Sequence, residues 1–508
     1  MHTGNIKYLG INISPRLSEL FSLNHNPLLK TIENDLERWT NLPLSLIGRI
    51  ASVKMKILPK LNYLFANIPA TPPDKWFQTL DSLMIHFYWK NKKAKIKLST
   101  LQKNKAQGGL EAPNFIHYHL ANQLQYLVKW TGQTYNNNTW ISLEQSYFKN
   151  LSLADIPSMN TTLKKHNCFK NTVISTTLTA WWKALKLTNS STAPCKYTPI
   201  WHNPDFHMNS TPLHYRTWEQ KGITHLHHLF HNNKFITFRQ LMEQFEINNN
   251  NRFQYLQIKS IIQSKINITN NTLDPPQLLE NIKNIKKPKK LISKLYKLIH
   301  SDNIIHAPQL KWNTDIDTPP TYELWTEICK NTFSMTSNTN LQLIQYKVIH
   351  RTHITQYKKF KMGLTDTDTC SQCTMGVTDT YLHALWECSP VQGFWNTVTH
   401  KLTDILSCRI PPSPSLCLLG IITTFTIPPK YKNSLLTSLT IAKKIILQNW
   451  KSKQSINIKH WSNSLIHHIS TSQMTAYFED DIPSFMETWT PFINHFNIVF
   501  NQSSISTT

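Results

Sequence analysis

Apolar residues recur at helical spacing along most of this chain. In the stretch PLSLIGRIASVKMKIL, Leu46, Ile50, Val53 and Ile57 follow one another at intervals of three and four residues, which predicts one apolar helix face. The pattern ends at Pro59, which stops a helix. Similar patterns elsewhere, only 11 glycines, and a strand-like pattern confined to the first thirteen residues predict a mainly α fold.

A second stripe on the same predicted helix is small, polar and basic. It comprises Ser45, Arg49, Ser52 and Lys56, with Gly48 where another backbone could come close. One interpretation is the solvated face of an amphipathic helix, and the other is a face that lies against nucleic acid.

Seven lysines and no acidic residue lie between Ser82 and Leu110. The aromatic residues of FYW, at positions 87–89, directly precede the densest part of this run. Aromatic side chains that stack and lysines that meet phosphates are typical of a nucleic-acid surface. The alternative is a lysine-rich loop in water whose aromatic residues point into a core. The pair Gly108 and Gly109 predicts a tight turn.

The net charge of the chain favours a polyanionic partner. The 508 residues carry a net charge of +25, from 54 Lys and Arg against 29 Asp and Glu. Nucleic acid and an anionic membrane surface are the two candidates. No apolar run reaches the roughly 20 residues of a spanning helix, and the start lacks the order of a signal peptide. We therefore expect a nuclear or cytoplasmic chain that is not secreted, with no membrane and no small-molecule substrate among its partners.

Two other patterns have plain structural explanations. The histidines of HLHHLFH, at positions 225–231, have leucines between them and no cysteine or acid beside them, which favours an amphipathic turn over a metal site. Seven more lysines lie between Glu280 and Asp302. They accompany an apolar helix face. One interpretation is that the lysines contact nucleic acid, and the other is that they face water; a membrane-surface role is the least favoured.

The strongest chemical motif is CSQCTMGVTDTYLHALWEC. Its spacing is Cys370-x2-Cys373-x9-His383-x4-Cys388. Three thiolates and one imidazole are the ligand set that tetrahedral zinc prefers, and they leave no open position for a reactive water. The surrounding sequence lacks the strand–helix context of a redox Cys-x-x-Cys motif. We predict one structural zinc ion.

Three stretches in order resemble the C-terminal part of the reverse transcriptases of non-LTR retrotransposons of the long interspersed element type. KYLGINIS followed by LPLSLIGRIASVKMKILPKLNYLFANIP is similar to the end of the palm and the thumb. FYWKNKKAKIKLSTLQKNKAQGGLEAPNFIHYHLA is similar to the segment that follows. YKVIHRTHIT, the Cys/His motif and VQGFW are similar to the C-terminal knuckle region.

The resemblance implies a domain organisation. Residues 1–13 would be a remnant of the polymerase palm, 14–132 a helical thumb-like domain, 133–335 a helical connector, and 336–508 a helical C-terminal domain with the zinc knuckle. Relatives carry an endonuclease and the catalytic palm ahead of this region, and the carboxylates that bind Mg²⁺ are absent here. YFEDD, ending at Asp481, imitates a catalytic turn but lies far downstream of the thumb, so we expect no enzyme.

The expected function is binding of RNA or an RNA–DNA duplex, with target DNA as a further candidate partner. The alternatives are an active RNA-directed DNA polymerase completed by a front half in trans, and a relic of an upstream-truncated element without selected function. By the resemblance, the thumb helix tracks the duplex backbone and the lysine run extends that surface. The expected contact residues are Arg49, Lys54, Lys56, Trp89, Lys90, Lys92, Lys93, Lys95 and Lys97.

Overall fold

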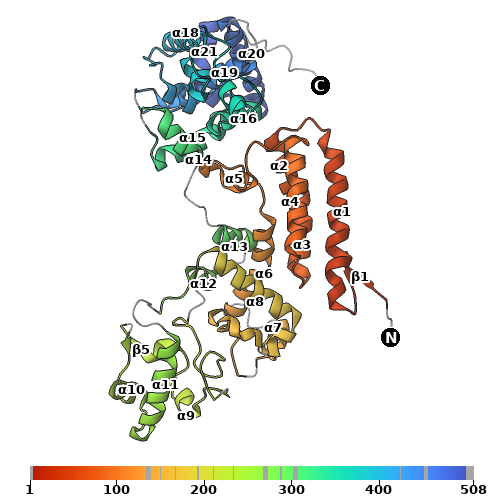
Figure 1. The fold of residues 1–508 in the computed structure, drawn as a ribbon, viewed down its shortest axis with the longest axis vertical. Helices are drawn as coiled ribbons and strands as arrows, with labels where there is room; N and C mark the ends of the chain where they lie inside the picture. Colours follow the sequence, from red (N-terminus) through yellow and green to blue (C-terminus); the bar gives the residue numbers. More distant parts are fainter. Residues whose placement is uncertain are drawn as a thin grey trace. The chain divides into compact units, whose positions relative to one another are not determined.

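The computed structural model describes residues 4–132, 139–148, 150–165, 167–190, 194–209, 211–232, 234–266, 273–286, 289–300, 307–317, 319–423, 425–450 and 456–498. Helices dominate these ranges, and their strands form three short antiparallel hairpins (Figure 1), which confirms the mainly α fold. The chain divides into two compact units, both discontinuous in sequence. The first unit comprises Met1–Asn41, Val53–Met84 and Pro113–Asn303, and the second comprises Leu42–Ser52, Ile85–Ala112 and Ile304–Thr508.

The first unit begins with a hairpin of β1 (Ile6–Tyr8) and β2 (Ile11–Ile13), which turns at Gly10 in a left-handed conformation. Most of the hairpin's side chains are exposed. The sequence predicted a strand here, and the structure shows two paired strands.

Long helices follow, and α6 is the one around which the others pack. Its Gln123 and Tyr126 side chains donate hydrogen bonds of 2.7 Å to the carbonyls of Phe65 and Ala66 at the end of α3. Its apolar side packs against α8 and α13, where Trp181 lies fully buried. The helices are α1 (Leu20–Thr40), a π-helical turn (Val53–Ile57), α3 (Leu58–Asn67), α4 (Asp74–Trp89, whose last five residues belong to the second unit), α6 (Phe115–Thr131), α7 (Thr139–Gln145), α8 (Thr172–Leu187), α12 (Gln277–Lys283) and α13 (Leu291–Ile299).

A separate apolar core lies within residues 200–273 of the first unit. Trp201, Leu213 and Trp218 are among its buried members, and short elements surround it. These elements are β3 (His207–Met208), β4 (Thr211–Pro212), α9 (Arg216–Gln220), β5 (Phe230–His231), β6 (Lys234–Phe235), α10 (Phe238–Phe245) and α11 (Arg252–Lys265).

The second unit is built on one large apolar core. Its tryptophans are anchored by polar contacts as well as by packing: Trp395 and Trp461 donate from Nε1 to backbone carbonyls at 2.9 and 3.0 Å. Trp325 and Trp489 are buried as well, whereas Trp450 is half-buried. Its helices are α2 (Leu46–Ser52), α5 (Leu98–Gln102), α14 (Ala307–Asp315), α15 (Tyr322–Ser334), α16 (Thr339–Ile349), α17 (Gln356–Lys361), α18 (Ser389–Leu406), α19 (Lys432–Gln448), α20 (Ile458–Phe478) and α21 (Ile482–Phe496).

Residues 85–112 belong to the second unit together with α2 and residues beyond 303, rather than to the first unit with α1 and α3. Tyr346 donates to the Gly108 carbonyl at 3.2 Å, and His350 Nε2 donates to the same oxygen at 2.8 Å. Gly108 has a φ of +77°, and a Cβ on Gly109 would overlap the Lys103 carbonyl. The predicted tight turn at these two glycines is therefore confirmed.

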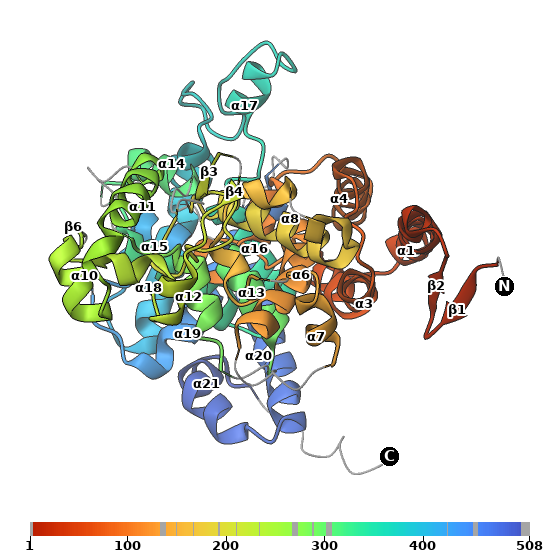
Figure 2. The same ribbon diagram turned by 90° about the horizontal axis from the view of Figure 1, so that it is seen from below.

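Within the second unit, α17 stands apart from α15, α16 and α18 (Figure 2). It is followed by the loop that carries the first two cysteines of the Cys/His motif. None of the helices in the described ranges has the length and apolar character that crossing a bilayer requires.

Candidate metal centre and basic surface

The four residues of the Cys/His motif come from a tight loop and a helical turn. The loop is closed by a bridge between Thr369 and Thr378 and by a hydrogen bond from the Cys370 N–H to the Val377 carbonyl at 2.9 Å. Gly376 allows the loop to turn back with a φ of +62°. This loop presents Cys370 and Cys373.

His383 and Cys388 lie at the two ends of a π-helical turn, His383–Glu387. The Cys388 N–H donates to the His383 carbonyl at 2.9 Å, which is the five-residue hydrogen bond of a π-helix. In an α-helix, residues five apart point to different sides, whereas this wider turn brings both side chains toward the loop. Cys388 is also the residue at the start of α18.

The ligand atoms lie at the separations of a tetrahedral site. Cys370 Sγ is 3.9 Å from Cys388 Sγ, and Cys373 Sγ is 3.5 Å from His383 Nε2. All four ligand atoms lie within 4.8 Å of one another. Bonds of about 2.3 Å to sulfur and about 2.0 Å to nitrogen place tetrahedral ligands about 3.5–3.8 Å apart. The cluster can therefore hold a metal ion.

Three of the four candidate ligands are shielded from solvent. Cys370, His383 and Cys388 are buried, and Cys373 is half-buried. Burial raises the pKa of the Cys370 and Cys388 thiols. A cation at the centre reverses this preference, because it stabilises the thiolate form that ligates metals.

Two carboxylates, Glu387 and Asp379, lie close to the ligands in sequence but differ in their contacts. Glu387 Oε2 lies 4.0 Å from His383 Nδ1, on the side of the ring away from Cys373. Asp379 Oδ2 instead accepts a hydrogen bond of 2.6 Å from the Gln356 N–H at the start of α17. Asp379 thus connects α17 to the segment before His383.

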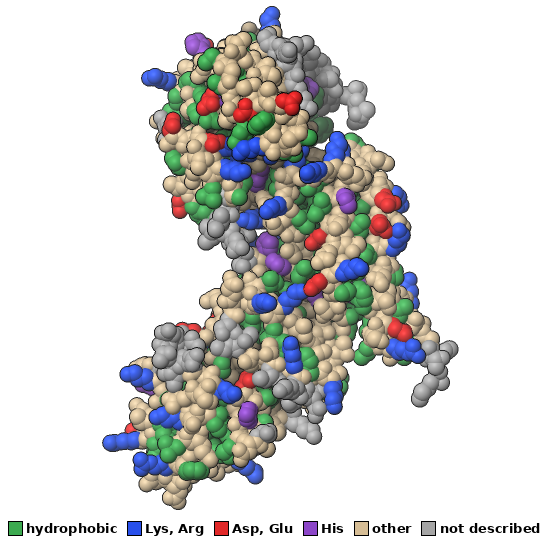
Figure 3. All heavy atoms as spheres, in the orientation of Figure 1, with side chains coloured by type: hydrophobic (Ala, Val, Ile, Leu, Met, Phe, Trp, Pro, Cys, Tyr) green, Lys and Arg blue, Asp and Glu red, His purple; other side chains and the backbone are tan. Residues whose placement is uncertain are grey.

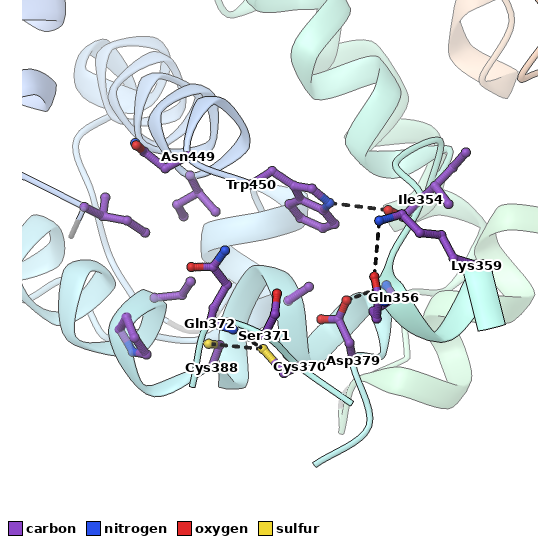
Figure 4. A pocket seen from close by; sticks show the side chains of 15 residues that line it. Ile354, Gln356, Lys359, Cys370, Ser371, Gln372, Asp379, Cys388, Asn449 and Trp450 are labelled. Carbon is purple, nitrogen blue, oxygen red and sulfur yellow. Dashed lines mark hydrogen bonds between the residues drawn. The ribbon is translucent and has the colours of Figure 1, made fainter. Parts of the chain in front are cut away.

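A cleft of about 350 Å³ lies beside Cys370 and Cys388. Figure 4 shows Trp450, which follows α19, facing Ile354 and the start of α17 across it. Trp450 Nε1 donates to the Ile354 carbonyl at 3.3 Å, and Lys359 Nζ donates to Gln356 Oε1 at 3.2 Å. The Trp450 contact joins the segment before α17 to the residues after α19, beside the candidate metal centre.

The lysine run forms an exposed loop, which we call the lysine loop (Lys90–Lys97). Its five lysines are exposed, and Lys90 and Asn91 adopt left-handed conformations that turn the chain out of α4. Phe87 and Tyr88 are buried and Trp89 is half-buried. The aromatic residues therefore face the core for the most part, as the second interpretation of this stretch expected.

Lys95 of the loop lies near two basic groups that the sequence analysis did not connect with it. The pKa of Lys347 is lowered by burial and then by Lys95, and the pKa of His353 is lowered to about 4 by burial, Lys95 and Lys347. Basic side chains gather on the second unit around α5 (Figure 3). This juxtaposition of residues more than 250 positions apart had no local signal in the sequence.

Arg49 is not on the surface that the sequence predicted. Its side chain is fully buried, and its guanidinium donates to the carbonyls of Leu44, Phe87 and Leu42 at 3.3, 3.0 and 3.1 Å. It also lies over the Phe87 ring. The expectation that Arg49 lies near a phosphate is therefore wrong, because backbone carbonyls and an aromatic ring take up its charge.

Lys54 and Lys56 lie on the π-helical turn Val53–Ile57 of the first unit. Lys56 is exposed and Lys54 is half-buried. The predicted apolar face of this helix is confirmed, since its members Leu46, Ile50, Val53 and Ile57 are buried.

The histidines at positions 225–231 and the YFEDD sequence both have structural roles. His228 Nδ1 accepts from the backbone N–H groups of Thr224 and His225, and His227 Nδ1 donates to the Lys196 carbonyl. YFEDD ends α20 and leads into α21, so it joins two helices.

A comparison with protein-family models finds none that matches this chain.

Proposed function

We propose that this chain binds RNA or an RNA–DNA duplex and that the lysine loop supplies its main phosphate contacts. The observation that carries this proposal is the concentration of exposed lysines without an acidic residue, placed near Lys347 and His353 of the same unit. Positive charge gathered in this way raises the local concentration of a polyanion. The resemblance to the rear part of a retrotransposon reverse transcriptase agrees with this proposal.

Such binding would have little sequence specificity. Lysines meet phosphates as point charges, and an A-form duplex is held through its shape and backbone rather than its base edges. Lys56 and Lys54 remain candidate contacts on the first unit, whereas Arg49 leaves the proposed interface. The proposed role is binding, with no catalytic residue assigned.

We further propose that the Cys/His cluster binds Zn²⁺ as a structural ion. Three sulfurs and one imidazole nitrogen are the ligands that zinc prefers, and they fill a tetrahedral shell. The ion would join the cysteine loop to the start of α18. Cys388→Ser should lose the metal in an elemental assay, whereas Cys408→Ser, which changes a half-buried cysteine outside the cluster, should retain it.

The binding proposal is tested by a salt titration on a primed RNA template and on duplex DNA. We expect a steep linear fall of log affinity with log salt concentration and a preference for the RNA-containing duplex. The triple variant Lys92→Gln, Lys93→Gln, Lys95→Gln should reduce the magnitude of the slope by about 2–3, because each phosphate contact contributes about 0.7–0.9.

The matched control places the same charge change on the other basic stretch, as Lys289→Gln, Lys294→Gln, Lys297→Gln. These lysines are also exposed, at or before α13 of the first unit. An equal reduction in both variants would show that only net charge matters. Absence of binding at low salt by a folded, zinc-loaded sample would contradict the proposal.

A further inference from the structure

A second group of metal-ligating side chains lies in the first unit, outside the Cys/His cluster. It consists of His202, His214 and Glu219, whose ligand atoms all lie within 4.8 Å of one another. His214 Nε2 is 2.9 Å from Glu219 Oε2, and the rings of the two histidines are 4.2 Å apart between centroids. The three side chains line one surface hollow.

The core of the first unit holds each of these side chains in place. Each of the three directly follows a buried apolar residue in the sequence, namely Trp201, Leu213 and Trp218. These three anchors belong to a single apolar cluster, so their positions are fixed by packing. Ligands attached to rigid anchors lose little conformational entropy when they bind an ion.

Backbone contacts fix the pairing of the two histidines. The His202 N–H donates to the Leu213 carbonyl at 2.9 Å, which sets His202 beside His214 although eleven residues separate them. His202 also adopts a left-handed conformation with a φ of +57°. A residue with a Cβ adopts it at a cost of about 1 kcal/mol or more, which the surrounding structure must offset.

We propose that His202, His214 and Glu219 form a second metal site, for a divalent transition-metal ion such as Zn²⁺. Two imidazoles and one carboxylate are a known three-ligand set for zinc, with the fourth position open to water. The nitrogen ligands exclude Mg²⁺ and Ca²⁺, which prefer oxygen. His214 and Glu219 are exposed, so an ion can enter directly from solution.

This site differs in chemistry from the Cys/His cluster. It offers no thiolate, two of its three ligands are exposed, and it leaves room for a water or a substrate atom. It therefore binds metal more weakly and exchanges it faster than the buried cluster does. It does not depend on the proposed nucleic-acid binding.

The test is a calorimetric titration of Zn²⁺ into the untagged 508-residue chain after its Cys/His cluster has been loaded. We expect one further equivalent of Zn²⁺ in the unchanged protein. His214→Ala and Glu219→Gln should each weaken this binding at least tenfold, with an unchanged far-UV circular dichroism spectrum. A Co²⁺ titration should add visible absorption without a sulfur-to-cobalt charge-transfer band.

The matched control is His400→Ala. His400 Nδ1 lies 3.2 Å from Asp404 Oδ2 in an exposed pair on α18, so it reproduces the histidine–carboxylate contact without the third ligand. This variant should keep the further equivalent. The proposal is overturned if the unchanged protein takes up no further Zn²⁺, if the His214 and Glu219 variants bind as tightly as the unchanged protein, or if His400→Ala shows the same loss.

Discussion

Arg49 belongs to the basic stripe of the predicted helix, but it does not reach the surface of the folded chain. Its guanidinium is inside the second unit, where the carbonyls of Leu42, Leu44 and Phe87 accept its hydrogens. A buried charge is tolerated when its donors are satisfied in this way. The sequence could not show this, because Phe87 lies 38 residues away from Arg49.

Arg49→Lys should lower the free energy of unfolding by about 2–4 kcal/mol, because one ammonium group cannot reproduce the planar fork of donors. Its effect on the salt dependence of RNA binding should be negligible. Chemical denaturation and the salt titration measure the two quantities. As a control, exposed Lys56→Gln should change stability by less than about 0.5 kcal/mol. A reduced salt slope with unchanged stability in Arg49→Lys would contradict the buried role.

Gly109 gives a second prediction at this scale. Gly109→Ala should destabilise the chain by about 2–4 kcal/mol, since the added Cβ would overlap the backbone carbonyl of Lys103. Gly393→Ala is the matched control, because Gly393 lies inside α18 with open space around it. It should stabilise the chain by about 0.5–1 kcal/mol. Thermal melts of the two variants should therefore shift in opposite directions.

At the scale of elements, the π-helical turn His383–Glu387 decides whether the Cys/His motif becomes a site. The sequence predicted the four ligands and their chemistry from spacing alone. It did not predict the π-helical hydrogen bond that brings His383 and Cys388 to one side, because helix type depends on small differences in packing. The ligand set was therefore more predictable than the backbone that presents it.

Removal of the metal should loosen the elements around the cluster and leave others unchanged. After chelation, we expect faster amide hydrogen exchange in residues 368–390, because the ligands then no longer hold the cysteine loop to α18. Exchange in α6 of the first unit should stay the same. Unchanged exchange in residues 368–390 of a sample shown to be metal-free would contradict a structural role for the ion.

The same reasoning explains which helices the sequence predicted. The apolar face through Leu46 and Ile57 follows from a local period, and burial confirmed it. The group of His202, His214 and Glu219 has no such period. Its only sequence signal is that each ligand directly follows an apolar residue, which becomes informative once those residues share a core.

At the scale of the whole molecule, buried neutral histidines should make the fold sensitive to acid. Burial lowers the pKa of His25 to about 4 and that of His119 to about 3. Both lie in the first unit, and neither ring of this pair has a hydrogen-bond partner among the described residues. The pKa of His468, in the second unit, is also lowered to about 4 by burial and two nearby basic groups.

An unfolded histidine binds its proton near pH 6.5, whereas these buried rings bind it only near pH 3–4. The unfolded state therefore binds more protons between these values, and stability falls as the pH drops below about 6.5. Each such group contributes up to about 1.4 kcal/mol per pH unit. Unfolding free energies measured from pH 7.5 to 5 should show a shallower fall in His119→Phe than in the unchanged protein. Equal slopes in His119→Phe and in the unchanged protein would contradict this account.

The division into two discontinuous units could not be predicted from local patterns. The sequence grouped residues 14–132 together, whereas residues 42–52 and 85–112 pack with residues beyond 303. Contacts such as Tyr346 to Gly108 join residues 238 positions apart. Only the complete set of long-range contacts shows which segments share a core.

These distant contacts set an order for folding during synthesis. α2 and the turn at Gly108 leave the ribosome early, but α16 and His350, which contact them, follow more than 200 positions later. At a translation rate of about 5–20 residues per second, the wait for the whole second unit lasts roughly 20–80 s. During this time the buried side of α2 and the apolar end of α4 are uncovered, while the exposed lysines beside them are already accessible to the RNA ligand proposed above. A nascent chain that engages its RNA in this interval would do so before its own C-terminal half exists.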